Sequence, residues 1–142
     1  MILRRILLNL KIFSHCLEIL YFYKFKSFFS CIQLIKFKEN DIGFGLSPNY
    51  LSKKINFFSR VLFQNNCFYE SMCLYSLLNK DEGIEFYIGV KNDNKNKISS
   101  HSWIEFKGAP INENILLQDF KPIFSLKKWM VSAVLYFWGP KK

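Results

Sequence analysis

The sequence predicts an α+β fold in which one helix packs against a small antiparallel sheet. Residues 67–79 carry apolar side chains at helical spacing and follow two asparagines, which are favourable residues just before a helix. Residues 84–90 and 101–106 are rich in branched and aromatic side chains, and the polar segment 91–100 between them is typical of a hairpin loop. After a turn at "KGAP", a third strand is expected from residue 111 onward.

The length of 142 residues fits one domain with short extensions. We expect residues 1–60 to form an apolar, basic helical extension followed by a connection. Residues 61–124 are expected to form the core, and residues 125–142 an apolar segment that packs on it. The glycines of the connection lack the Gly-Lys-Ser/Thr sequence that a phosphate loop needs, and residues 52–63 are expected to form a short helix.

The first 38 residues are expected to form an amphipathic helix, because apolar side chains recur there at every third or fourth position. These positions include Ile6, Leu10, Phe13, Leu17 and Leu20. The charge-free runs are shorter than the ~20 residues that cross a bilayer, and no cleavable secretory signal follows them. We therefore expect a cytoplasmic protein whose extension packs on the domain, docks a protein partner or lies on a membrane surface.

The net charge of +9 does not by itself predict a nucleic-acid partner. The lysines are scattered, and neither an arginine-rich stripe nor a glycine-aromatic motif accompanies them. The four cysteines form no CxxC pair and the chain has two histidines, which argues against the paired ligands of a structural zinc site. We expect no nucleic acid, no metal, no cofactor and no disulfide framework.

Cys67 stands where a helix is expected to begin, and this position favours thiol chemistry. The N–H groups and dipole of a helix N-terminus stabilise a thiolate, and a nearby imidazole activates the sulfur as a nucleophile. His101, at the start of the second strand, is the candidate imidazole, whereas His15 is expected to be a polar residue of the N-terminal helix. The competing interpretation of Cys67 is a small buried hydrophobic residue. We expect that role for the other cysteines, Cys16, Cys31 and Cys73.

A third side chain is needed to hold the imidazole in the correct tautomer. Side chains alternate along a strand, so that His101, Trp103 and Glu105 share one face. Beyond the turn, the next strand offers Glu113 or Asn112, and antiparallel neighbours can place such side chains beside the histidine.

A combination of motifs runs through residues 65–112. A cysteine opens a helix that ends in two leucines, a glycine follows, and a strand ends in "IGV"; after a polar loop comes "HSWIE" with a later glycine. This pattern resembles the transglutaminase-like cysteine-protease domain of lasso-peptide biosynthesis proteins, the microcin-processing leader peptidases. The matching residues are Cys67, Leu77, Leu78, Gly83, Ile88, Gly89, Val90, His101, Trp103, Ile104, Glu105 and Gly108.

The resemblance implies a transglutaminase/papain-like core, over residues 61–124, with a Cys-His-acid triad. Cys67 then corresponds to the nucleophile and His101 to the general base. Glu113 falls where the family carries an aspartate, with Asn112 and Asp119 as alternative third members. Trp103 and Glu105 are expected to support the strand rather than to take part in catalysis.

The stabilisation of an oxyanion would require the Cys67 backbone N–H and one further donor. Gln64, Asn65 and Asn66 are the available donors before it, although we expect Asn66 to cap the helix instead. Ser102 stands where the family usually carries alanine.

The activity implied by the resemblance is removal of the leader from a ribosomally made precursor peptide. The implied partners are the precursor, a leader-recognition protein and an ATP-dependent cyclase. Two alternatives belong to other classes of protein: a catalytically inactive transglutaminase-like scaffold, and a membrane-associated basic accessory protein. A true transglutaminase, which transfers the acyl group to an amine, is chemically compatible with the same triad.

Overall fold

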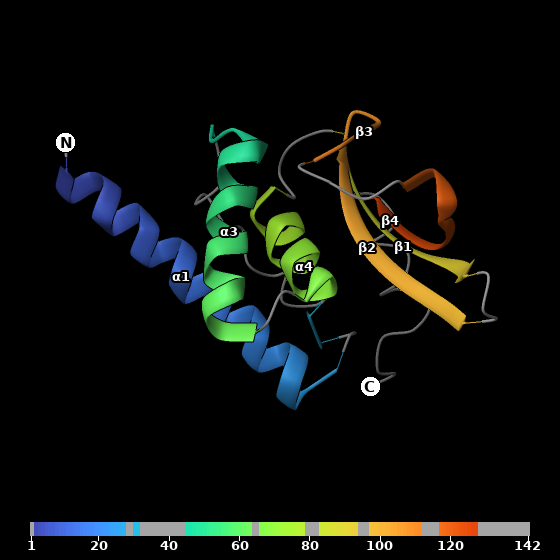
Figure 1. Cartoon of the computed structure of the whole chain (residues 1–142). Helices are drawn as coiled ribbons and strands as arrows, with labels where there is room; N and C mark the ends of the chain where they lie inside the picture. The colour runs from blue at the N-terminus through green and yellow to red at the C-terminus, as the bar shows by residue number, and fades with distance from the viewer. Residues whose placement is uncertain are drawn as a thin grey trace, which may run out of the picture.

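The three-dimensional structure is a computed structural model, and it describes residues 2–27, 30–31, 45–63, 66–78, 83–93, 97–111 and 117–127. In the described part of the chain, helices are followed by a four-stranded antiparallel sheet, so the predicted α+β class is confirmed (Figure 1). The helices are α1 (Ile2–Phe25), α3 (Pro48–Phe63) and α4 (Cys67–Leu78). The strands are β1 (Ile84–Asp93), β2 (Lys97–Phe106), β3 (Ala109–Pro110) and β4 (Lys121–Lys127), with a short 3-10 helix, η1 (Leu117–Asp119), before β4.

The strands of the sheet lie in the order β3-β2-β1-β4. β1 and β2 form a hairpin whose register runs from Ile84 opposite Phe106 to Asp93 opposite Lys97. The predicted ten-residue loop was therefore wrong in extent, because most of that polar segment continues the two strands. Main-chain hydrogen bonds hold such a ribbon together without apolar side chains, which is why the composition of the segment concealed it.

The turn predicted at "KGAP" is confirmed. Lys107 and Gly108 have positive φ angles of 51° and 78°, a conformation that glycine adopts without steric cost. The chain then forms β3, and the N–H of Ile111 donates to the carbonyl of Ile104 at 2.9 Å. The third strand expected from residue 111 falls on 112–116, which lie outside the described residues, whereas β4 was not predicted at all.

The helix α4 is the centre of the molecule. It lies between the sheet on one side and α1 and α3 on the other (Figure 1), and nine of its twelve residues are buried. Because α4 carries apolar side chains on almost all of its sides, it can pack against the sheet and against the other helices at once. From the sheet, the buried side chains of Ile84, Phe86, Ile104 and Leu126 join the same core.

The predicted N-terminal helix is present as α1, which continues through Lys11 and Glu18 without a break but ends at Phe25, well before the expected residue 38. Its buried residues are Ile12, His15, Cys16 and Ile19. By length and composition α1 could cross a membrane, although the charge-free runs within it are shorter; a soluble core helix or a signal sequence would meet the same criterion. The boundaries expected at residues 60 and 124 stay predictions, and residues 128–142 lie outside the described part.

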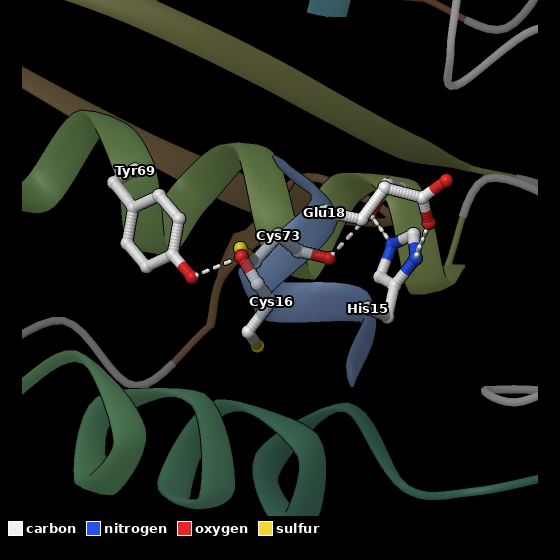
Figure 2. A network of polar contacts seen from close by, with 6 residues as sticks. His15, Cys16, Glu18, Tyr69 and Cys73 are labelled. Atoms are coloured by element: carbon white, nitrogen blue, oxygen red, sulfur yellow. Dashed lines mark hydrogen bonds and ion pairs between the residues drawn. The ribbon is translucent and has the colours of Figure 1, made fainter. Parts of the chain in front are cut away.

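A buried polar network attaches α1 to α4 (Figure 2). The hydroxyl of Ser76 donates to the carbonyl of Cys73 at 2.8 Å and lies 2.5 Å from His15 Nε2, and the hydroxyl of Tyr69 donates to the carbonyl of Cys16. His15 is a polar residue of the N-terminal helix, as expected, but it is only 3% exposed and lies within the interface between α1 and α4. Its contact with Ser76 across the helix interface is not recognisable in the sequence, because the two residues lie 61 positions apart.

Three of the cysteines are buried free thiols, as predicted: Cys16, Cys31 and Cys73. Burial raises the pKa of Cys31 to about 11 and that of Cys73 well above its ordinary value. Such thiols stay protonated near neutral pH and are poor nucleophiles.

We predict that replacing His15 with alanine destabilises the fold by about 2–3 kcal/mol, because it removes a buried hydrogen bond and leaves a cavity between α1 and α4. The free energy of unfolding, measured by urea titration, tests this. Ser14→Ala is the matched control, since Ser14 is exposed on the same helix and its loss should change stability by less than about 0.5 kcal/mol. Equal effects of the two substitutions would show that the network contributes nothing.

Candidate active site

The first turn of α4 is fixed by Asn66. Its side-chain Oδ1 accepts a hydrogen bond from the N–H of Tyr69 at 3.1 Å, and its carbonyl accepts one from the N–H of Glu70 at 3.0 Å. The predicted capping role of Asn66 is thus confirmed, and it makes Cys67 the first residue of the helix. Gln64 and Asn65, the other suggested oxyanion donors, lie outside the described residues.

The strand β2 lies alongside this turn. The hydroxyl of Ser71, one helical turn after Cys67, donates to the carbonyl of Ser102 at 3.0 Å, and both residues are buried. β3 pairs with Glu105 and Phe106, and within the described residues no strand pairs with the outer edge of β2 at the level of Ser102. The N-terminal end of α4 occupies the space next to this edge.

Cys67 meets His101 and Ser102 at the edge of β2. Burial acts to raise the pKa of the Cys67 thiol, but four favourable interactions outweigh it and leave the pKa below its ordinary value. In decreasing order these are a hydrogen bond with the His101 side chain, one with the Ser102 backbone, one with the Ser102 side chain, and the charge of the imidazole. Each stabilises the thiolate more than the thiol.

The Ser102 side chain contributes less than the imidazole. Its hydroxyl is buried and makes no hydrogen bond of ordinary geometry, so we place its effect on the sulfur below that of His101. The Ser102 backbone N–H fits the geometry better, because β2 faces α4 at this level and the edge of a strand directs such donors outward.

Cys67 differs from the other three cysteines in two properties. It is half-buried, whereas Cys16, Cys31 and Cys73 are fully buried. Its pKa is lowered, whereas the pKa values of Cys31 and Cys73 are raised. A partly exposed thiol with a depressed pKa is the combination that reactive cysteines show.

The imidazole of His101 is held between aromatic rings. The Trp103 ring lies nearly parallel to it at 6.3 Å between centroids, and Phe120 contacts it at 5.6 Å. Trp103 in turn stacks on Tyr87 at 5.3 Å and donates its indole N–H to Glu105 at 3.0 Å. The predicted common face of His101, Trp103 and Glu105 is therefore confirmed, and the latter two support the ring from the strand.

Gly89 makes room for this stack. It lies opposite His101 in the β1–β2 hairpin. A Cβ atom at this position would stand 2.9 Å from two carbons of the Trp103 ring and 3.1 Å from Cβ of Phe120. Any side chain would push these rings away from the histidine, which gives the glycine of "IGV" a physical reason.

The position of the expected third triad residue does not follow from the described residues. Glu113 and Asn112 lie in the segment 112–116, outside the described part. Asp119 is exposed on η1, while its neighbour Phe120 contacts His101. The structure brings together Cys67 and His101, and Glu113 stays a prediction.

Ser102, Tyr87 and Phe120 were not identified as part of the site from the sequence. Tyr87 and Phe120 reach His101 or its neighbour Trp103 only through strand pairing and the turn before β4, and no motif marks them. Ser102 was noticed only as a departure from alanine. Within the described residues, no group of three or more His, Cys, Asp or Glu side chains is placed to hold a metal ion.

A thiol and an imidazole in this arrangement can carry out nucleophilic acyl transfer. The imidazole accepts the thiol proton and later delivers it to a leaving group. The N–H groups of Tyr69 and Glu70 are already bonded to Asn66, so the candidate donor to an oxyanion in this turn is the backbone N–H of Cys67.

Comparison with known proteins places this pair of residues in a family context. The model of the transglutaminase-like superfamily matches residues 51–125. The match is more than half of the 142 residues, and it extends from α3 through α4, β1 and β2 into β4. It contains both Cys67 and His101. No curated protein and no solved structure matches the chain.

We predict that alkylation of Cys67 by iodoacetamide reaches half its maximal rate at a pH below 9.0, the ordinary value of a thiol, and that His101→Gln moves this midpoint upward. The direction follows because the imidazole lowers the thiol pKa, so its loss reduces the thiolate fraction near neutral pH. Mass spectrometry of the peptide that contains Cys67 separates its labelling from that of the other thiols.

Ser100→Ala is the control for this measurement, because Ser100 is exposed and adjacent to His101 on β2. It should titrate like the unaltered protein. A midpoint that is the same with and without His101 would mean that the histidine does not act on the sulfur.

Proposed function

The chain belongs to the transglutaminase-like superfamily, which includes cysteine peptidases, and from this premise we propose that it is a cysteine peptidase. Its proposed reaction is removal of the leader peptide from a ribosomally made precursor, as in lasso-peptide maturation. The observation that carries the proposal is the contact of the partly exposed Cys67 thiol with the His101 imidazole, which together with Ser102 lowers the pKa of the thiol despite its partial burial.

The proposed reaction proceeds in two steps. The Cys67 thiolate attacks the scissile carbonyl carbon, and the C–N bond of the resulting tetrahedral intermediate breaks as the His101 imidazolium protonates the leaving amine. The product is a thioester between Cys67 and the leader. A water molecule, deprotonated by the now neutral imidazole, then attacks the thioester and releases the leader as a carboxylic acid and Cys67 as the thiol.

The start of α4 supports the stabilisation of the tetrahedral intermediate. Its negative oxygen would lie near the Cys67 backbone N–H, at the positive end of the helix dipole. Because Asn66 uses its side-chain oxygen to cap Tyr69, the amide N–H₂ group of Asn66 is the part of that side chain left to face other partners, and it donates to the hydroxyl of Tyr23 at 3.5 Å.

Glu113 is the proposed third member of the triad, with Asn112 and Asp119 as alternatives. A carboxylate hydrogen-bonded to one ring nitrogen fixes the tautomer that leaves the other nitrogen free to take the thiol proton. The family carries aspartate at this point, and glutamate retains the carboxylate with one additional methylene.

The finer assignment to leader removal rests on the sequence resemblance to the lasso-peptide leader peptidases. The match includes "IGV" and "HSWIE", which lie on the two paired strands of the β1–β2 hairpin, with Gly89 opposite His101. We propose three partners on the same basis: the precursor peptide, a leader-recognition protein and an ATP-dependent cyclase.

We predict that the purified chain, mixed with a precursor and its leader-recognition partner, releases the leader, and that Cys67→Ala abolishes the release. His101→Ala should slow it by about a hundredfold or more, because a general acid–base group is lost. Mass spectrometry of the cleaved products measures both effects.

Glu113→Gln and Asp119→Asn distinguish the alternative acids in the same assay. If Glu113 is the third member, only Glu113→Gln reduces the rate. Retention of the biological function by Cys67→Ala would instead identify a scaffold, and incorporation of an added amine in place of hydrolysis would identify a transglutaminase.

A second candidate function, association with a membrane, is favoured by the exposed side of α1. The N-terminal part of this helix projects beyond α3 (Figure 1) and exposes large apolar side chains among basic residues. The exposed apolar residues are Ile2, Leu3, Ile6, Leu7 and Leu10, and the basic ones are Arg4, Arg5 and Lys11. Apolar and basic side chains on one helix suit an anionic lipid surface. We propose a cytoplasmic protein that contacts a membrane through α1.

We predict that the protein sediments with vesicles containing phosphatidylglycerol and stays bound after a high-salt wash, because the apolar contact is not screened. The variant with Leu7→Glu and Leu10→Glu should remain in the supernatant. Its matched control carries Ile98→Glu and Ile123→Glu, which replace even more exposed apolar residues of the sheet and should leave binding intact. Loss of binding in both variants, or in neither, would contradict a role of α1 at the membrane.

A further inference from the structure

An open apolar pocket lies at the N-terminal end of α4. Its volume is about 490 Å³, and its lining side chains are Tyr23, Phe68, Ile88 and Phe124. They come from four different elements: the end of α1, the first turn of α4, β1 and β4. The Tyr23 hydroxyl is the one polar side-chain atom among these four residues.

We propose that this pocket binds an apolar side chain of the peptide that Cys67 cleaves, two or three residues from the scissile bond. The inference rests on the proposed peptidase function and adds to it a preference for an aromatic or large aliphatic residue. Three observations support it: the strand register, the contacts of the first turn of α4, and the composition of the pocket.

The strand register places the pocket next to the reactive thiol. Ile88 lies directly opposite Ser102 on β2 and opposite Phe124 on β4, so the three side chains form a row on the face that α4 covers. Ser102 is the residue whose backbone hydrogen-bonds the Cys67 sulfur at the outer edge of β2. Neighbouring strands are ~4.8 Å apart, so the pocket begins within roughly two strand spacings of the sulfur.

Both sequence neighbours of Cys67, at the first turn of α4, contact the pocket residue Tyr23. Phe68, the next residue, packs on Tyr23 at 5.4 Å and on Phe86 at 6.0 Å between ring centroids. Asn66, the preceding residue, donates its side-chain N–H to the Tyr23 hydroxyl at 3.5 Å. An extended peptide advances ~3.3–3.6 Å per residue, so a chain held at Cys67 reaches the pocket after two or three residues.

The composition of the pocket selects the occupant. Three aromatic rings and one branched aliphatic side chain offer neither a charge nor a buried hydrogen-bond partner to a polar residue, so transfer of a polar side chain from water is unfavourable. The volume accommodates a large side chain, whose burial provides the greatest gain from apolar contact.

Tyr23 gives the pocket a property that the superfamily match does not supply. Phe68, Ile88 and Phe124 lie within the matched residues 51–125, whereas Tyr23 lies on α1, before them. The wall formed by α1 therefore makes this side-chain preference a feature of this chain, and the N-terminal helix contributes to substrate choice as well as to packing.

Peptidyl acyloxymethyl ketones test the proposal directly. In their reaction the Cys67 sulfur forms a bond to the methylene carbon, the C–O bond to the carboxylate breaks, and the carboxylate leaves. Two matched series carry either Phe or Ala at one position, moved from the first to the fourth residue before the ketone. The rate of Cys67 labelling, measured by mass spectrometry and divided by the iodoacetamide rate of the same protein, isolates peptide recognition from thiol reactivity.

We expect Phe at the second or third position to accelerate labelling at least about tenfold over Ala, and no comparable gain at the first or fourth. Equal, measurable rates for Phe and Ala at every position would overturn the pocket and leave the peptidase standing. If iodoacetamide labels Cys67 but no peptidyl ketone does, the peptidase proposal fails and this inference fails with it. This comparison uses the unaltered chain, so it decides the question even where a variant unfolds.

Two variants locate the effect. Tyr23→Ala removes one wall and should reduce the Phe-to-Ala ratio, and Ile88→Trp should fill the pocket and abolish the ratio. Tyr21→Ala is the matched control, because Tyr21 is also an exposed tyrosine of α1 and does not line the pocket. A ratio that falls equally in the Tyr21 and Tyr23 variants would show that α1 does not form the binding wall; circular dichroism verifies that each variant is folded.

Discussion

The contact between the first turn of α4 and the outer edge of β2 is the interaction on which the rest of the site depends. Asn66 caps the N-terminus of α4, and the cap makes Cys67 the first residue of the helix. The hydrogen bond from the Ser71 hydroxyl to the carbonyl of Ser102 then fixes the position of α4 along β2. With both constraints in place, the Cys67 sulfur has His101 and Ser102 as neighbours, and its pKa falls despite partial burial.

The imidazole is positioned by shape as much as by hydrogen bonding. Tyr87, Trp103 and His101 form a continuous stack across the face of the sheet that α4 does not cover, and Phe120 contacts His101 from the segment before β4. The stack needs the space that the missing side chain of Gly89 provides. A motif such as "IGV" therefore records a packing requirement of the histidine on the neighbouring strand, and not a requirement of its own strand.

The helix α1 joins the structure to two of the proposed functions. Its central part is attached to α4 by buried apolar side chains and by the contacts of His15 and Cys16, and its last turn provides Tyr23 beside the reactive end of α4. Its first turns leave the domain with their apolar side chains exposed. In the proposed functions, one helix thus holds a membrane-contacting surface, the apolar pocket and the thiol in a fixed spatial relation.

The sequence by itself determined the local structure and pointed to Cys67 and His101 as a pair. The cap at Asn66, the helix that begins at Cys67, the two strands of the hairpin and the shared face of His101, Trp103 and Glu105 follow from neighbouring residues and the periods of helix and strand. Only the tertiary structure decided the burial of His15, the pairing of β4 with β1, and the gathering of Ser102, Phe120 and Tyr23 around the site. These depend on contacts between residues far apart in the chain, and no local pattern records which distant side chain will fill a given space.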